Sequence, residues 1–399
     1  MTAASGGSTR WAMLGLVFAV RAGLGFQFQT VASVGDPLAS DLGLSYAELG
    51  TLIGVFFLPG LVLAMPVGYA GRYVSDKQLV ALGLASLALG AGVCATATAF
   101  GPMTFGRVLC GVGFVVCTIF MTKMIADWFT GKEIATAMAI LVMSWPFGIA
   151  MGQVGHTWLA AAMGWQWAFA AAALYSLAGA VLTLAAYRPP AASPGVTPPA
   201  TSTAAVPSAT TGMTRREWKL VILAALVWGC FNAAFIVYLS FASRVLIAGG
   251  YGTFEAAAVI SLASWVMILS GAACGQLADR TGKSDIILYI CLVVAMVSLA
   301  LLPQTNLAVP VALAFGLVGM APAGLIMALT SQAVAPERRA FGMGVFFSIF
   351  FLFTAPTPTI AGWLYDLSGD PFRPILLGIA MFGLTMVANV GFRMAQRRT

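Results

Sequence analysis

The sequence predicts an all-α integral membrane protein with twelve transmembrane helices, arranged as two six-helix repeats. Composition is the first reason, because 60% of the 399 residues are hydrophobic and only 8% are charged, which is not the composition of a soluble domain. Apolar runs of about 20 residues, the length that spans a bilayer, also recur along the whole chain. A polar segment near the middle leaves equal numbers of these runs on its two sides.

Each helix is expected where an apolar run lies between charged, Gly-containing or Pro-containing loops. In chain order the runs are 11–33, 47–70, 78–99, 102–126, 134–160, 165–187, 218–242, 254–278, 285–302, 307–333, 341–365 and 372–394. Residues 188–217 are rich in Pro, Ala, Ser and Thr and cannot bury enough apolar surface to fold alone. We therefore expect a bundle at 1–187, a disordered cytoplasmic linker at 188–217 and a second bundle at 218–399.

The positive charges predict how the bundle is oriented. All of the 20 Lys and Arg residues except Arg21, Arg107, Arg244 and Arg373 fall on one side of the membrane when the N-terminus is cytoplasmic. The positive-inside rule then predicts that both termini face the cytoplasm. The net charge of +7 follows from this topology, so no nucleic-acid partner is inferred from it.

The first run carries Arg21 near its middle, without an acidic residue in the run to neutralise it. A cation at bilayer depth costs about 2.5–3.5 kcal/mol on insertion scales, so this arginine points to a function. Helical spacing places Gly25, Phe28 and Gln29 on nearly the same face, adding bare backbone, an aromatic wall and an amide. Because a guanidinium binds planar anions through paired hydrogen bonds, we expect a small-anion site here. The alternative is a structural arginine bonded to carbonyls or helix ends.

Two loops, after the second and eighth runs, resemble each other. The second copy reads GQLADRTGK over residues 275–283, and the first reads GYAGRYVSDK over residues 68–77. The first copy has Arg72 at the place where the second has Asp279. Glycine permits a tight turn between helices, and the charges can bond helix ends across a cleft. We expect a gating role for Arg72, Lys77, Asp279 and Arg280.

Several acids are expected partners for these loop charges. Asp127, at the end of the fourth run, is a partner for Arg72 or Lys77. Glu133 or Glu337 is a partner for Arg280. The alternative for each pair is that these are ordinary loop charges whose apolar stems cover the membrane edge.

The fourth and fifth runs carry further motifs. Arg107 begins the stretch RVLCGVG at 107–113, and either a coupling role or satisfaction by neighbouring carbonyls is consistent with it. The fifth run contains SWPFGIAMG at 144–152, where Gly148 and Gly152 form a small-residue packing face. We expect this helix to pack closely at the interface between the repeats.

Other polar and aromatic residues are expected to line the cavity. The seventh run, the repeat mate of the first, offers Asn232 and Tyr238 and no second arginine, which favours a monoanion over a doubly charged phosphate. The remaining candidates on other helices are Trp145, Trp265 and Thr354. Prolines at 356 and 358 predict a kink in the eleventh helix. The lone His156 is expected at the outer membrane interface.

The loop, the helix-four motif, the linker and the twelve runs together resemble the major facilitator superfamily over the whole chain. The second loop copy matches that family's G-x-x-x-D-R-x-G-[RK] pattern, and the first copy departs from it at Arg72. Arg21 and the Ser144-Trp145-Pro146 stretch are similar to the bacterial cyanate-permease-like and nitrate/nitrite-porter-like groups. The resemblance implies a monomeric carrier in the bacterial inner membrane that moves small anions or small organic acids by alternating access between two halves.

The energy source is left open by the sequence. The carboxylates lie in loops or at helix ends, so co-transport of a proton, anion exchange and uniport are all consistent with it. An enzyme is not expected, because metalloprotease and P-loop motifs are absent from the sequence, and neither a cofactor nor a metal is implied. Efflux of neutral or lipophilic molecules is the alternative function.

Overall fold

The computed structural model describes residues 3–71, 73–129, 133–190, 213–335 and 338–397, and all regular structure within them is helical. The first half contains α1 (Ala3–Ser33), α2 (Gly35–Leu42), α3 (Tyr46–Gly54), α4 (Leu58–Ala70), α5 (Asp76–Ala95), α6 (Phe100–Trp128), α7 (Ile134–Met163) and α8 (Trp165–Ala186). The second contains α9 (Arg215–Ala248), α10 (Thr253–Thr281), α11 (Ser284–Leu301), η1 (Thr305–Leu307), α12 (Ala308–Ala314), the π-helical turn η2 (Phe315–Gly319), α13 (Ala323–Ala333), α14 (Arg339–Thr354), α15 (Thr357–Ser368) and α16 (Arg373–Arg397).

The expected twelve-helix fold class is confirmed. Twelve helical segments among the described residues are long and apolar enough to cross a membrane. Three of these spans are built from shorter pieces: α3 with α4, α12 with η2 and α13, and α14 with α15. The break between Thr354 and Thr357 is the kink predicted from the two prolines, which interrupt the helical hydrogen-bond ladder.

The outer faces of the helices suit a lipid environment. Large apolar side chains along the spans have exposed fractions of 60–73%, among them Leu89, Leu174, Val181, Leu269 and Val387. A soluble protein rarely exposes so many large apolar side chains along its helices. The chain is therefore a multi-pass membrane protein.

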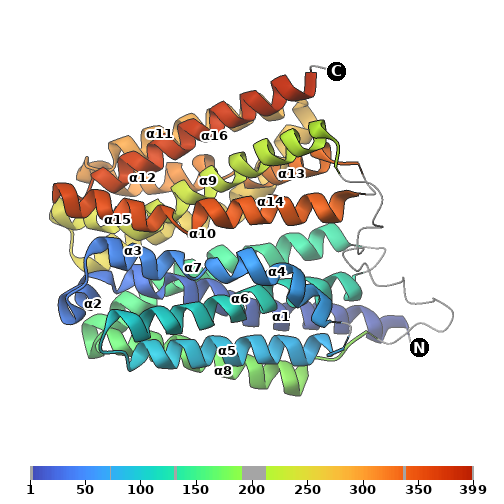
Figure 1. Cartoon of the computed structure of the whole chain (residues 1–399), viewed down its shortest axis with the longest axis horizontal. Coiled ribbons are helices and arrows are strands. Elements are labelled where there is room, and N and C mark those ends of the chain that lie inside the picture. The colour runs from blue at the N-terminus through green and yellow to red at the C-terminus, as the bar shows by residue number, and fades with distance from the viewer. Residues whose placement is uncertain (1–2, 72, 130–132, 191–212, 336–337, 398–399) are drawn as a thin grey trace.

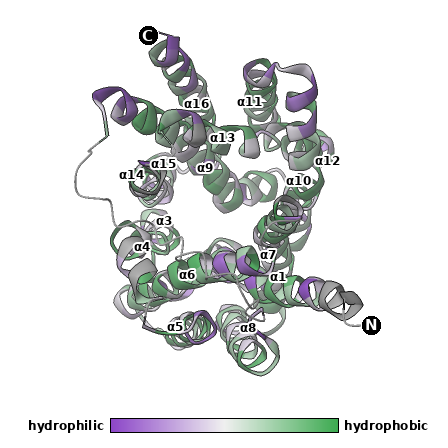
Figure 2. Ribbon diagram, turned by 90° about the vertical axis from the view of Figure 1, so that its right-hand side faces the viewer, coloured by the Kyte–Doolittle hydropathy of each residue, from purple (hydrophilic) through white to green (hydrophobic). Residues whose placement is uncertain are grey.

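The two halves lie side by side (Figure 1). The start of α1 and the end of α16 lie at one end of the bundle, here called the terminal end. The other end, which carries α2, is called the distal end. Viewed from the terminal end, α7 lies beside α10 at one edge of the molecule, and α3 and α4 lie beside α14 and α15 at the other (Figure 2).

Side-chain caps start several helices. Ser45 accepts a hydrogen bond from the Glu48 backbone N–H while the Glu48 carboxylate accepts one from the Ser45 N–H. Thr214 and Glu217 form the same capping box at the start of α9. Each box pairs backbone N–H groups that a helix end would otherwise leave unbonded. Because α9 begins at Arg215, residues 215–217 of the expected linker belong to a helix.

Candidate functional site

Arg21 lies on α1 and is partly buried, with α7 packed against this helix. Its Nη1 donates hydrogen bonds to the Leu141 carbonyl oxygen at 2.8 Å and to Ser144 Oγ at 2.9 Å. Its buried Nε has no partner, and the ion pairs between described residues do not include it. The guanidinium is therefore anchored at one corner, and its other N–H groups keep their capacity to bind an anion.

Gly25 does not present bare backbone to a ligand, because α7 crosses α1 at this point. A Cβ at Gly25 would clash with the Trp145 carbonyl oxygen, and a Cβ at Gly148 would clash with the Ala22 carbonyl oxygen. Gly152 also lies against α1, next to Gln29 Cβ. The glycine face predicted for helix five packs against α1 in the same half, whereas α7 meets the other half through α10. This close crossing places Ser144 within reach of Arg21.

Phe28 is the centre of an aromatic cluster on the first half. Its ring centroid lies 5.2 Å from that of Phe57 and 5.4 Å from that of Trp145. Phe114 lies 5.3 Å from Trp145 and 5.0 Å from Phe56. Trp145 and Phe114 are partly exposed, whereas Phe28 is buried. Three of these rings, at positions 56, 57 and 114, lie within apolar runs that give no local sign of a ligand.

Gln29 connects the two halves. Its side chain is buried, and its Nε2 donates to the Leu239 carbonyl oxygen of α9 at 3.5 Å and to Ser33 Oγ at 3.4 Å. Its Oε1 is buried without a hydrogen-bond partner among the described residues. Gln29 therefore lies on the distal side of Arg21, where α1 meets α9.

Arg107 is fully buried and its guanidinium is surrounded by acceptors. Nε donates to the Leu52 carbonyl oxygen at 2.9 Å, Nη1 to that of Gln27 at 3.1 Å and Nη2 to that of Phe28 at 3.4 Å. Its Cζ lies 4.7 Å from the centroid of the Phe56 ring. Of the two roles consistent with the sequence, this geometry favours satisfaction by neighbouring carbonyls.

The predicted residues of α9 are bonded within the second half. Asn232 is partly exposed and donates to the Trp228 carbonyl oxygen at 2.8 Å, one turn earlier. Tyr238 is fully buried, and its hydroxyl donates to the Ile260 carbonyl oxygen at 3.3 Å. Asn232 keeps an amide oxygen for a ligand, whereas Tyr238 packs inside its own half.

Trp265 and Thr354, which were also predicted to line the cavity, lie in different parts of the structure. Trp265 is 38% exposed, and its ring meets that of Phe147 on α7 edge-on, with centroids 5.3 Å apart. Thr354 is buried and donates to the Phe350 carbonyl oxygen of its own helix at 2.8 Å. Trp265 therefore lies at the interface between halves, and Thr354 bonds its own backbone just before the kink.

Among the described residues, the predicted gating residues Lys77 and Asp127 of the first half contact groups in their own half. Lys77 Nζ donates to the Tyr187 carbonyl oxygen at 3.1 Å, at the end of α8. Asp127 pairs with Lys123 one turn earlier on α6, at 3.5 Å, and Lys123 also pairs with Asp76. A lysine close to a helix C-terminus is stabilised by the helix dipole, which explains the position of Lys77.

Among the described residues, no hydrogen bond or ion pair joins the second copy of the loop to the first half. Asp279 and Arg280 are both exposed at the end of α10. Glu133, expected to pair with Arg280, pairs with Arg10. Arg72 and Glu337 lie outside the described residues. The ion pairs that we describe at the terminal end therefore each lie within one half.

Strong contacts between the halves instead lie at the distal end. Arg244 of α9 pairs with Asp36 of α2 at 2.8 Å, and its guanidinium lies 5.0 Å from the Tyr46 ring centroid. Asp366 of α15 accepts hydrogen bonds from the backbone N–H groups of Tyr46 at 2.9 Å and Ala47 at 2.8 Å. We call Asp36, Arg244 and Asp366 the distal latch. The distal end is closed in this structure.

His156 is not interfacial, contrary to the prediction. It is fully buried, with Nε2 3.0 Å from the Phe26 carbonyl oxygen and 3.2 Å from Thr30 Oγ1. Because a carbonyl only accepts, Nε2 carries the proton, and Nδ1 is a buried acceptor without a described partner. The apolar segment gave no local sign of this packing against α1.

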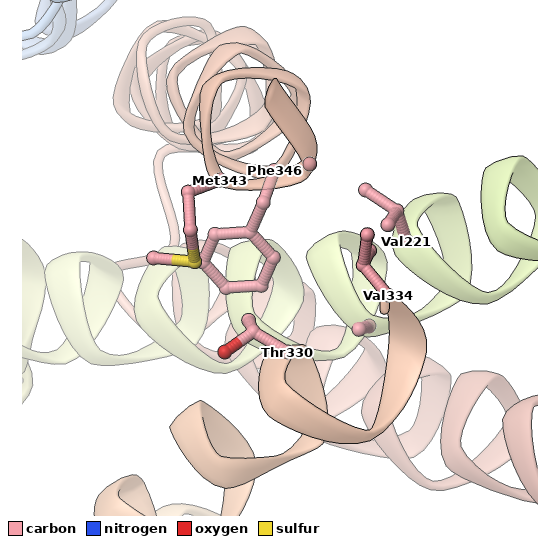
Figure 3. A pocket seen from close by; sticks show the side chains of 7 residues that line it. Val221, Thr330, Val334, Met343 and Phe346 are labelled. Atoms are coloured by element: carbon pink, nitrogen blue, oxygen red, sulfur yellow. The ribbon is translucent and has the colours of Figure 1, made fainter. Parts of the chain in front are cut away.

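Two cavities among the described residues have mainly apolar linings. One, of about 80 Å³, lies between α9, α13 and α14, lined by Val221, Thr330, Val334, Met343 and Phe346 among others (Figure 3). The other, of about 290 Å³, is a groove between the halves that includes Leu58, Leu61 and Leu352, all exposed on the surface of the helices. Neither includes Arg21.

The described residues thus form twelve helices long and apolar enough to span a membrane, in two halves with partly buried polar groups where the halves meet, an arrangement typical of polytopic membrane transporters. Residues 16–349 match the family model described as Major Facilitator Superfamily, and the chain belongs to that family. Proteins of this family are transporters and not enzymes.

The similar proteins agree with this assignment. A 192-residue segment, 43% of this chain and 40% of the relative, is 29% identical to monocarboxylate transporter 12 of Xenopus laevis. The alignment thus spans about two fifths of that relative's length. A mutant of the nucleoside transporter NupG has a TM-score of 0.73 at 14% identity, covering 96% of this chain and 99% of that one. A bacterial homologue of the human lysosomal transporter Spinster, inward-facing and unoccupied, has a TM-score of 0.72 at 18% identity, covering 98% and 97%.

Proposed function

We propose that this chain is a secondary transporter that moves a small monoanion across the membrane by alternating access, with Arg21 as the anion-binding residue. The observation that carries the proposal is the state of the Arg21 guanidinium. It lies within a membrane span, has no ionic partner among the described residues and uses only Nη1 for hydrogen bonds. An intramembrane charge held in this way is best compensated by a bound anion.

A short monocarboxylate fits this site best. A carboxylate is planar and pairs with two N–H groups of one guanidinium, and its single charge matches a single arginine. The aromatic cluster around Phe28 and Trp145 supplies an apolar wall for a short carbon chain. The partial similarity to a protein named as a monocarboxylate transporter supports the same substrate class.

The mechanism follows from which end is closed. With the distal latch formed, the substrate enters from the terminal end and reaches Arg21. Substrate binding favours rearrangement only because the substrate binds the two access states with different affinity. Opening the distal end breaks the contacts of Asp366, Arg244 and Gln29 between the halves. Asp279 and Arg280, exposed in this state, pair across the halves when the terminal end closes.

We further propose a monomer in the bacterial inner membrane, with both termini cytoplasmic, that moves the anion alone or with a proton.

Ligand-induced thermal stabilisation of the purified protein tests the proposal, because a ligand that binds the folded state raises apparent stability. The parent, Arg21→Gln and the control Arg373→Gln are titrated with short carboxylates, small inorganic anions and lipophilic cations. Arg373 is an exposed arginine at the distal end, so its replacement removes the same charge outside the site. We expect one anion class to stabilise the parent and the control but not Arg21→Gln. Equal stabilisation of all three proteins by every anion would refute the proposal.

Efflux of neutral or lipophilic molecules is the second candidate function. The observation that favours it is the apolar groove between the halves, whose lining includes the exposed Leu58, Leu61 and Leu352. Stabilisation by lipophilic compounds to the same extent in the parent and in Arg21→Gln would support this function instead.

A further inference from the structure

Arg21 and Asn232 occupy matching positions on α1 and α9, one helix from each half. On α1, Arg21 is partly exposed and every residue from 22 to 31 is buried. On α9, Asn232 is partly exposed and every residue from 233 to 242 is buried. The three residues before Asn232, 229–231, are buried as well, so protein surrounds α9 here and Asn232 alone keeps exposed surface. Each of the two polar side chains therefore lies at the terminal side of a fully buried distal stretch.

The two side chains also lie at nearly the same level of the bundle. Gln29 Nε2 is 3.5 Å from the Leu239 carbonyl oxygen, so these positions on α1 and α9 are level. The ion pair of the distal latch joins residues that come later in both segments, so the two helices run in the same direction. Arg21 comes eight residues before Gln29 and Asn232 seven residues before Leu239, rises of about 12 and 10.5 Å. Asn232 is therefore level with Arg21 to within a helical turn.

Aromatic rings connect the two positions across the halves. Five rings, each with its centroid 6.4 Å or less from that of the next, run from the first half to the second: Trp145, Phe28, Phe57, Phe350 and Trp228. At one end, Trp145 follows Ser144, the hydrogen-bond partner of Arg21. At the other end, Trp228 supplies the carbonyl oxygen that Asn232 bonds. An aromatic surface shared by both halves therefore joins the surroundings of the two polar side chains.

The amide of Asn232 has a fixed orientation. Its Nδ2 donates to the Trp228 carbonyl oxygen at 2.8 Å, and a carbonyl only accepts, so the nitrogen is turned back towards the helix. No hydrogen bond to its Oδ1 is described, and the side chain is partly exposed. This oxygen is therefore an acceptor for a ligand. Because Arg21 already places a positive charge without an ionic partner at this level, a cationic donor is disfavoured and a neutral hydroxyl is favoured.

We propose that Asn232 is a specificity-determining residue of the substrate site, where its amide oxygen accepts a hydrogen bond from a hydroxyl group of the transported anion. This inference rests on the proposed function, in which Arg21 binds the carboxylate. The substrate class is then a short hydroxymonocarboxylate that lies across the two halves. Because its two binding residues belong to different halves, the substrate engages both only at one separation of the halves. This requirement supplies the difference in affinity between access states on which alternating access depends.

Four acids of equal chain length test the role of Asn232: butanoate and its 2-hydroxy, 3-hydroxy and 4-hydroxy derivatives. Affinities are measured by thermal stabilisation and by competition for uptake into proteoliposomes. One added hydrogen bond of ordinary strength makes at least one hydroxy acid bind the parent about fivefold more tightly than butanoate. In Asn232→Leu this affinity ratio falls to about one, while butanoate binds as in the parent. Asn306→Leu, the same change at an exposed asparagine of η1, keeps the parent ratio.

The outcomes separate this inference from the proposed function. If the parent binds all four acids equally and Arg21→Gln binds none, the role of Asn232 is wrong and the anion site stands. A preference for a hydroxy acid that persists in Asn232→Leu also overturns the inference, because the hydroxyl then bonds elsewhere. If no acid binds in an Arg21-dependent way, both proposals fail. Should Asn232→Leu not fold, Asn232→Ala removes the amide without adding volume, and the same loss of preference is expected.

Discussion

Removing the Asp366 carboxylate is expected to open the distal end. Asp366 belongs to α15 in the second half, yet it accepts hydrogen bonds from the Tyr46 and Ala47 N–H groups, the first two of α3 in the first half. These N–H groups lie at the positive end of the helix dipole, where a carboxylate is favoured. The contact exists only while the halves are close, so Asp366→Ala destabilises the distal-closed state relative to the distal-open one.

The size of the effect follows from the two bonds. Hydrogen bonds to a charged group contribute about 1.5–3 kcal/mol each when buried. Asp366 is exposed, so solvent screening reduces each to about 1 kcal/mol. A loss of about 2 kcal/mol changes the equilibrium about 30-fold. A distal-open population of about 1% in the parent would then rise to about a fifth in Asp366→Ala.

Distance measurements between two spin labels at the distal end follow this population. Labels at Ser40→Cys of α2 and Leu367→Cys of α15 report on separate halves, and both positions are exposed. The native cysteines are all buried, which favours labelling of the introduced ones. Asp370→Ala is the matched control, because Asp370 is exposed at the same end but bonds to Phe372 and Arg373 in its own half.

We expect a longer-distance population to appear in Asp366→Ala and not in Asp370→Ala. An unchanged distance distribution in Asp366→Ala would show that the carboxylate does not hold the halves together. The same increase in both variants would mean that the negative charge at the distal end, and not the contact with α3, sets the balance between the distal-closed and distal-open states.

Three further substitutions have defined outcomes. Gly54→Ala introduces a Cβ that clashes with the Ala355 carbonyl oxygen, so it should lower uptake at least tenfold and lengthen the spin-label distance. Gly92→Ala is the control, because a Cβ at Gly92 meets open space, and it should change neither uptake nor the distance. Arg107→Lys should lower the free energy of unfolding by about 2–4 kcal/mol, because one ammonium group cannot reach all three carbonyl oxygens. Thermal unfolding measures this effect, and an unchanged melting temperature would contradict the expectation. Arg244→Lys loses ring stacking and should raise the distal-open population severalfold, and a distance distribution like the parent's would argue against a role for the planar guanidinium.

The fold was predictable because its signals are local. Hydropathy identifies each span, and the prolines at 356 and 358 identify the kink. The distal latch depends on contacts between residues more than 200 positions apart, such as Asp36 with Arg244, which no local pattern specifies. Two signals were nevertheless present. Arg244 is one of few cations that depart from the positive-inside distribution, and Gly50 with Gly54 forms a small-xxx-small pair, at which α15 approaches α3.

The two intramembrane arginines of the first half show why hydrogen-bond saturation, and not burial alone, identifies a binding residue. Arg107 and Arg21 both lie within apolar helices, and both carry a cost of insertion. Arg107 uses three nitrogens on three carbonyls and stacks on Phe56, so an anion would have to displace bonds that already exist. Arg21 uses one nitrogen and is partly exposed, so an anion adds bonds without breaking any. Substrate binding is therefore expected to depend on Arg21, and folding on Arg107.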